Sequence, residues 1–336
     1  MELVIPYCGA PNGEAIAHSI KKHHKDVTLI GADSNPDCDN RWLFDEFYTV
    51  PSTGSKIYSN VVEDFFKNCD FILPLNGYDA VALKKTSLRD KVLATDDCNT
   101  MLNVMDKDYL YNTFHMKHAT VYADELLETV MYYMTLYDSA VVKVQSGRGT
   151  RGVFIVADFD DMKNRVYHKP GVLDMSYPVF ERMVNTTSLN KKFIVMPYYE
   201  GTEFFVNALC RNGEVEWMQT IQIDGKRDHV ASKFKVVEYD IVDDKAISIC
   251  KRFKFDYWVN LQFIDENLIE INPRISSWVA HPDYSVPYLA VRMALGEDIN
   301  KVPRVKIGTV GRRIFQMYYM EGMYAVSYTH LTLPTN

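Results

Sequence analysis

The sequence predicts an α/β protein in which a doubly wound parallel domain precedes two α+β lobes. The chain has 336 residues, which is more than twice the ~150 residues of a typical domain. Up to about residue 100, short apolar runs alternate with amphipathic helices, as in a parallel sheet covered by helices on both faces. From residue 139 onward, strand patterns follow one another closely, which is typical of antiparallel sheet.

The first domain is expected over residues 1–100. Its strands are predicted at 3–7, 27–32, 70–75 and 91–94, with a helix from Glu14 to about His24. Asp33 ends the second strand, where a dinucleotide-binding domain places a ribose-binding acid. The first turn has glycines only at Gly9 and Gly13, without the GxGxxG spacing. We therefore interpret it as a doubly wound domain, and a nicotinamide-dependent oxidoreductase is the alternative.

The second domain is expected over residues 101–322. An Asn212-Gly213 turn predicts a hairpin within it. His115 and His118 are three residues apart and are expected to share a helix face, without a carboxylate partner that would complete a metal site. Helices are predicted over 101–116, over 123–136 and around Phe180, and strands over 139–144, 153–157 and 192–198.

The charge balance argues against nucleic acid as a partner. The chain carries 37 Lys and Arg against 44 Asp and Glu, a net charge of −7, and its basic residues form no stripe. No window approaches the ~20 apolar residues of a membrane span, and the N-terminus lacks a signal-peptide pattern. We expect a cytoplasmic protein that binds neither nucleic acid nor membrane. The six Cys form no CxxC pair, so we expect reduced thiols and no zinc-thiolate site.

A glycine-rich loop lies between two predicted strands. Residues 147–152 read GRGTRG, which fits GxGxxG, but the strand that follows excludes a Rossmann turn. The absence of Gly-Lys-Ser/Thr excludes a P-loop. Lys143, Arg148 and Arg151 place positive charge at this loop. The pattern favours a flap whose amides cover nucleotide phosphates, and an ordinary glycine hairpin is the alternative.

A second hairpin gathers oxygen-bearing side chains. Strands are predicted over 259–264 and 268–274, joined by a three-residue turn. Because side chains alternate along a strand, Gln262, Glu270 and Asn272 are expected on one surface. Oxygen ligands suit Mg²⁺ bound to phosphates, and Arg274 can neutralise a transferring phosphoryl group. A wetted sheet face is the alternative.

These elements, in this order, resemble the ATP-grasp superfamily. The resemblance rests on the Lys143 strand with its glycine flap, Met-Pro-Tyr-Tyr-Glu-Gly-Thr-Glu, Asn-Leu-Gln-Phe and Ile-Glu-Ile-Asn-Pro-Arg. It covers about residues 1–320 and is closest to the carbamoyl-phosphate-synthase-like, carboxylate–amine ligase branch. It implies a pre-ATP-grasp domain, then an ATP-grasp fold whose small lid spans about 115–196. Residues 327–336 do not look like the family's end, and we expect a non-native or disordered tail.

The resemblance also implies a site. Its predicted cofactors are ATP and Mg²⁺ (or Mn²⁺), and Arg274 and Lys143 are its catalytic residues. Arg274 is implied to steady the acyl-phosphate step. Metal ligands are Gln262, Glu270 and Asn272. Nucleotide contacts are Lys107 and Lys143 on phosphates, Ser146, Gly147, Gly149, Thr150 and Gly152 in the flap, Val195, Met196 and Tyr198 at adenine, and Glu203 at ribose.

The implied activity is ATP-dependent ligation of a small-molecule carboxylate to an amine or similar nucleophile, with release of ADP and phosphate. The family often dimerises, so a homodimer is possible. A regulatory or catalytically silent Mg-ATP-binding protein is the second alternative, beside the oxidoreductase. Arg227, His229 and Lys233 are candidates for contact with an anionic substrate, and Trp278 and His281 for the substrate pocket.

Overall fold

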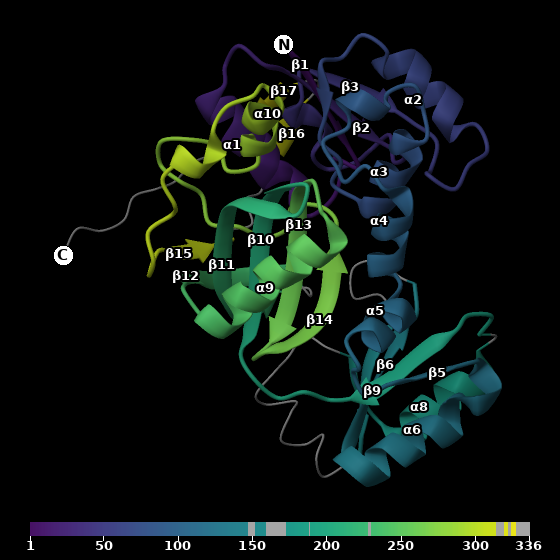
Figure 1. The fold of residues 1–336 in the computed structure, drawn as a ribbon. Helices are drawn as coiled ribbons and strands as arrows, with labels where there is room; N and C mark the ends of the chain where they lie inside the picture. The colour runs from purple at the N-terminus through teal and green to yellow at the C-terminus, as the bar shows by residue number, and fades with distance from the viewer. Residues whose placement is uncertain are drawn as a thin grey trace.

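The structure is a computed structural model that combines parallel and antiparallel sheets, and it confirms the α/β class with α+β lobes (Figure 1). It describes residues 1–146, 152–158, 173–187, 189–227, 230–313, 319–321 and 324–326. Gly147, Gly149, Thr150, His229 and the tail 327–336 lie outside the described residues. Within the described part, no helix has the length and apolarity needed to cross a bilayer.

The N-terminal part is a parallel sheet, as the sequence predicts, with four strands in the order β3-β2-β1-β4. The sequence does not predict β3. The expected strands over 70–75 and 91–94 are shorter than predicted. Pro74 has no N–H for the ladder, and Val92 forms only an isolated parallel bridge with Ile72. The elements are β1 (Glu2–Pro6), α1 (Gly13–His23), β2 (Thr28–Asp33), η1 (Arg41–Leu43), β3 (Glu46–Thr49), α2 (Tyr58–Phe66), β4 (Phe71–Ile72), α3 (Gly77–Lys84) and η2 (Arg89–Lys91).

Two helices replace the single helix expected over 101–116. α4 (Cys98–Met105) and α5 (Lys107–Thr113) are separated at Asp106, whose carboxylate accepts the backbone N–H groups of Asp108 and Tyr109. An Asp in this extended conformation caps a new helix and prevents continuation of the old one. The prediction that His115 and His118 share a helix face is therefore wrong. α5 ends before His115, whose φ is 53°.

The small lobe carries a five-stranded sheet in the order β5-β9-β6-β7-β8. In Figure 1 it lies at the bottom of the view, with α6 and α8 on its outer face. Phe193 and Val195 pack in the cluster beneath these helices, whereas Ile194 and Met196 pack toward the large lobe. Its elements are β5 (Ala119–Val121), α6 (Ala123–Tyr137), β6 (Ser139–Val144), β7 (Val153–Ala157), β8 (Leu173–Ser176), α8 (Tyr177–Thr186) and β9 (Phe193–Pro197).

The large lobe carries an antiparallel sheet in the order β14-β13-β10-β11-β12-β15. One face packs on α9, and the other shares a buried cluster with the N-terminal sheet through Trp217 and Trp258. Positive φ at Asn212 (48°) and Gly213 (84°) confirms the predicted turn. The elements of the large lobe are β10 (Glu203–Arg211), β11 (Glu214–Arg227), β12 (Val230–Val237), α9 (Asp240–Phe253), β13 (Tyr257–Ile264), β14 (Asn267–Asn272), α10 (Leu289–Ala294), η3 (Ile299–Lys301) and β15 (Val310–Arg312). Two short strands follow, β16 (Tyr319–Glu321) and β17 (Tyr324–Val326).

Candidate functional site

Glu270 on β14 lies among cations from other elements. Lys107 is the first residue of α5, and its Nζ is 3.9 Å from Glu270 Oε1. The carboxylate also favours the charged forms of Lys143 on β6 and of Arg274 just after β14. The Glu270 carboxylate therefore lies in the field of three cations, one from α5, one from β6 and one from the segment just after β14.

Asp106 holds Lys107 in position and connects it to the small lobe. Besides capping α5, its two carboxylate oxygens accept hydrogen bonds from Gln145 Nε2 at 3.1 and 2.9 Å. The Lys107 N–H in turn donates to the Gln145 carbonyl at 3.3 Å. Gln145 directly follows β6, so these bonds fix the start of α5 against the strand that leads to the glycine loop.

Lys143 is buried against Tyr111. Its Nζ donates to the Tyr111 hydroxyl at 3.2 Å, and that hydroxyl donates to the Ile269 carbonyl at 2.9 Å. Burial lowers the pKa of Lys143 to about 8, although Glu270 opposes the shift. Tyr111 thus connects Lys143 of the small lobe with β14, the strand that carries Glu270.

The β13–β14 hairpin places the predicted metal ligands in facing positions. Gln262 pairs with Glu270, and Asn260 pairs with Asn272. The turn is shorter than predicted, because Ile264 pairs with Asn267 across two residues. A bulge after Gln262 compensates for the shorter turn and restores the register that a three-residue turn would give. Without it, Glu270 would face the buried Leu261 side of the sheet.

A buried amide ladder orients Gln262. Its Nε2 donates to Asn260 Oδ1 at 3.1 Å, and Asn260 Nδ2 donates to Asn207 Oδ1 at 3.3 Å. Asn207 and Asn260 are fully buried. Because the Gln262 N–H bonds to Asn260, its carbonyl oxygen is directed away from Asn260, as a metal ligand must be.

The same ladder fixes the segment after Arg274. Asn207 Nδ2 donates to the Ser277 carbonyl at 2.5 Å, and its Oδ1 accepts the Ser276 N–H at 3.0 Å. Gln219, the cross-strand partner of Asn207, exchanges two hydrogen bonds with the Val279 backbone. The Arg274 guanidinium itself donates to the Ile275 carbonyl at 3.1 Å.

Of the predicted adenine contacts, Met196 and Tyr198 lie at the junction of the two lobes, whereas the Val195 side chain packs beneath α6 and α8. Val195 and Met196 are buried on β9, with Met196 facing the large lobe, and Tyr198 is half-buried beside it. Glu203 begins β10 and forms an ion pair with Lys226 at 2.6 Å. Gly152 has φ 76°, and a Cβ there would lie 2.9 Å from Val144 Cγ2, so glycine is required.

Other predicted contacts are less informative. Ser146 is exposed and is the last described residue before the glycine-rich loop. Lys233 is exposed on β12. His281 stacks on Tyr284 with ring centroids 4.2 Å apart and accepts the Asp283 N–H, which favours a packing role. Trp278 is buried, and its Nε1 has no hydrogen-bond acceptor among the described residues.

Sequence reasoning missed Tyr111, Gln145, Lys226 and the amide ladder. Tyr111 had a signal, since it lies four residues after Lys107 and so on the same helix face. The ladder had a weaker one, in amide residues placed within otherwise apolar strands. Lys226 had none, because its approach to Glu203 depends on the pairing of β10 with β11.

Comparison with known proteins identifies the fold. Residues 190–314 match a family model described as "ATP-grasp in the biosynthetic pathway with Ter operon". The biotin carboxylase domain of Hydrogenobacter thermophilus 2-oxoglutarate carboxylase aligns with TM-score 0.61, 13% identity, 98% of this chain and 83% of that one. This chain has the ATP-grasp fold.

Further ATP-grasp structures agree. Phosphoribosylglycinamide synthetase from Anaerococcus prevotii aligns with TM-score 0.58 and 16% identity, over 94% of this chain and 81% of that one. N5-carboxyaminoimidazole synthetase from Staphylococcus aureus, complexed with ADP, aligns with TM-score 0.54 and 14% identity over 84% and 71%. A search of curated proteins finds no match. The expected resemblance to the ATP-grasp superfamily is confirmed at the level of the fold.

Proposed function

We propose that the chain is an ADP-forming ligase that activates a small-molecule carboxylate with ATP and joins it to an amine or a similar nucleophile. The observation that carries the proposal is the setting of Glu270, with Lys107 Nζ at 3.9 Å and with Lys143 and Arg274 in its field. Such a set of cations around a potential metal ligand suits a triphosphate, whose charge it offsets.

The hairpin residues fit a hard divalent cation. Gln262 and Glu270 lie opposite each other, and Asn272 follows on the same face of β14. Their carboxylate and amide oxygens are the ligands that Mg²⁺ (or Mn²⁺) takes beside phosphate oxygens. When bound, the metal would neutralise phosphate charge and hold the phosphate chain in one orientation.

The nucleotide is proposed to lie between the lobes. Met196 and Tyr198 pack at the junction where adenine would lie, and Glu203 would accept hydrogen bonds from ribose hydroxyls. Lys107 and Lys143 would bind phosphates from two sides, with the flap amides above them. Because Lys143 is buried, its interaction with a phosphate would be screened little by water.

The reaction needs positioning and charge stabilisation and no covalent enzyme intermediate. A carboxylate oxygen of the substrate attacks the γ-phosphorus, the bond to the β–γ bridging oxygen breaks, and ADP leaves. Arg274 and Lys143 offset the charge on the transferring phosphoryl group. The amine then attacks the acyl carbon, phosphate leaves with the bonding pair, and the amine proton passes to solvent or base.

The fold neighbours support this class of chemistry. The Hydrogenobacter thermophilus domain was solved as a dimer with MgADP, ADP and bicarbonate, and two other neighbours are synthetases by name. We propose that Trp278 lines the pocket for the carboxylate substrate. Its buried indole N–H has no acceptor among the described residues, and it lies in the segment after Arg274 that the amide ladder holds. A homodimer is proposed on the same basis, and sedimentation velocity tests it.

The experiment is an ADP-release screen. The protein is incubated with Mg-ATP, a panel of amino acids and small carboxylates, and hydroxylamine, which traps acyl phosphates as hydroxamates that mass spectrometry identifies. We expect ADP release that depends on one class of carboxylate and a matching hydroxamate. Mg-ATP binding without ADP release from any carboxylate would instead identify a silent binding protein. A change in absorbance at the reduced-nicotinamide band, when the same panel is mixed with oxidised or reduced nicotinamide cofactor, would identify the oxidoreductase alternative.

A further inference from the structure

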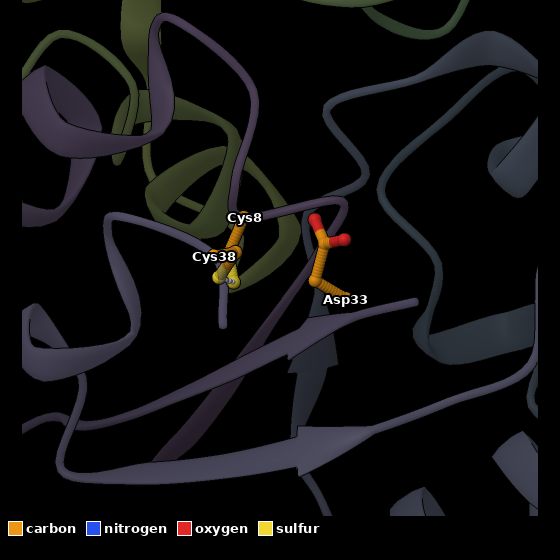
Figure 2. Close-up of side chains that lie close together, drawn as sticks. All are labelled: Cys8, Asp33 and Cys38. Atoms are coloured by element: carbon orange, nitrogen blue, oxygen red, sulfur yellow. Dashed lines mark hydrogen bonds between the residues drawn. The ribbon is translucent and has the colours of Figure 1, made fainter. Parts of the chain in front are cut away.

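Two cysteines and an aspartate meet at the carboxyl ends of β1 and β2, in the N-terminal domain. Cys8 follows β1, Asp33 ends β2, and Cys38 lies in the connection toward β3 (Figure 2). The two sulfur atoms are 4.0 Å apart, and all three potential ligand atoms lie within 4.8 Å of one another. Each residue is at most 6% exposed, so the cluster is enclosed by the fold.

The sulfur spacing distinguishes between two kinds of cysteine pair. A disulfide would bring the sulfurs to about 2.05 Å, so the pair would have to close by roughly 2 Å. Two thiolates bound to one tetrahedral Zn²⁺, each at about 2.3 Å, lie roughly 3.8 Å apart. The two thiols share a hydrogen bond at 4.0 Å, which is also close to the metal-bridged spacing and far from the disulfide spacing.

The backbone around the cluster holds its ligand atoms in place. Asp33 Oδ2 accepts the Gly9 N–H and Oδ1 accepts the Asn35 N–H, each at 3.0 Å. Outer partners of this kind orient first-sphere ligands and stabilise their charged forms in metal sites.

Close backbone packing keeps the cluster compact. A Cβ on Gly9 would lie 2.9 Å from both Asp33 Oδ2 and Cys38 Cβ, so only glycine fits between them. Asn40 Nδ2 donates to the Cys8 carbonyl at 2.9 Å and so fixes the backbone that carries the first thiol. The three ligands are thus held in place before any metal binds.

We propose that Cys8, Cys38 and Asp33 bind one divalent cation of the zinc class, with a water molecule as the fourth ligand. Two thiolates, a carboxylate and a water are a ligand set that Zn²⁺ accepts in tetrahedral geometry. Binding displaces one proton from each thiol, so about two protons are released per metal ion.

A bound divalent cation would offset the charge that its ligands bring together. The two thiolates formed on binding and the Asp33 carboxylate have ligand atoms within 4.8 Å of one another, and a cation between them compensates their negative charge. The expected role of the metal is structural: it would stabilise the turn after β1, which carries Cys8 and also Asn12. Asn12 Nδ2 donates to the Ile275 carbonyl at 3.5 Å, so this turn contacts the residue next to Arg274.

The test uses the whole 336-residue chain with its thiols reduced, stripped of metal and titrated with Co²⁺ and Zn²⁺. We expect one equivalent of Co²⁺ to give thiolate-to-cobalt charge-transfer absorption in the near ultraviolet, and Zn²⁺ to displace it. The melting temperature should rise on Zn²⁺ addition, and about two protons should be released. Cys8→Ser and Cys38→Ser should each abolish the absorption, and Asp33→Asn should weaken binding by tenfold or more.

Cys69→Ser is the matched control, because Cys69 is a buried thiol of the same domain outside the cluster, and it should bind Co²⁺ as the wild type does. Circular dichroism confirms that each variant is folded. Absence of charge-transfer absorption in the wild type, or its persistence in Cys8→Ser, would overturn the proposal. A Cys8–Cys38 cross-link formed readily by hydrogen peroxide in a protein that binds no Co²⁺ would overturn it too. None of these readouts involves ATP, so failure here is separate from failure of the ligase proposal.

Discussion

Lys107 and Glu270 meet across two elements, with Lys107 Nζ 3.9 Å from Glu270 Oε1, although 163 positions separate them in the sequence. α5 supplies the cation at its first residue and β14 supplies the carboxylate. In this arrangement, each charge partly compensates the other before any nucleotide binds. A metal-bound triphosphate would replace this ion pair with two separate interactions, metal on Glu270 and phosphate on Lys107.

Lys143 predicts a pH dependence of nucleotide affinity. Burial lowers its pKa to about 8, and bound phosphate would favour the ammonium and raise that pKa. Affinity that depends on the ammonium is therefore fully present below about pH 8 and falls as the pH rises, by up to about tenfold per unit. The dissociation constant for Mg-ATP checks this pH dependence. It is measured by calorimetry from pH 6.5 to 9.5, in steps of about half a pH unit.

Lys143→Arg should flatten this profile, because a guanidinium stays charged over the whole range. Lys107→Arg is the matched control and should keep the wild-type shape. An affinity that is constant with pH in the wild type would contradict the role assigned to Lys143.

Tyr111→Phe should weaken nucleotide binding with a modest loss of stability. It removes the hydroxyl that accepts from Lys143 and donates to the Ile269 carbonyl. The loss of these buried bonds should cost about 1–3 kcal/mol of unfolding free energy, and the KM for ATP should rise severalfold. Tyr109→Phe, on the same helix but 41% exposed, should change neither quantity. Equal behaviour of the two variants would show that Tyr111 does not position Lys143.

Asp106→Ala should separate helix capping from site assembly. Asp97 and Asp106 each cap a helix, so Asp97→Ala and Asp106→Ala should both lose about 1 kcal/mol of stability. Only Asp106 also binds Gln145 beside the lid strand. We therefore expect the KM for ATP to rise in Asp106→Ala alone, as steady-state ADP release would show. A matching rise in Asp97→Ala would mean that lost stability, not lost positioning, explains the effect.

Much of the fold could be predicted from the sequence, because period and turn chemistry are local. Short runs of apolar residues located β6, β7 and β9, and the Asn212-Gly213 pair located a tight hairpin. Local signals failed where one residue changed the geometry. Asp106 divided a predicted helix by capping, and Pro74 shortened a predicted strand.

The candidate site could be predicted only where its residues are neighbours along one strand or motif. Gln262, Glu270 and Asn272 follow from alternation, although the bulge that sets their register leaves no sequence signal. The contacts of Tyr111 with Lys143 and of Glu203 with Lys226 depend on the packing of distant elements. The Cys8–Cys38 pair was missed for the same reason, since a CxxC search detects only ligands close in sequence.

Glu270 is proposed to bind the metal that carries ATP, and the comparison of two glutamate variants tests this role. Glu270→Gln keeps the side-chain shape and removes the charge, and Glu266→Gln does the same at the exposed turn of this hairpin. With the carboxylate found by the screen, we expect Glu270→Gln to lower ADP release by at least about a hundredfold, with unchanged circular dichroism. Glu266→Gln should retain wild-type turnover. Turnover by Glu270→Gln at the wild-type rate would contradict the account.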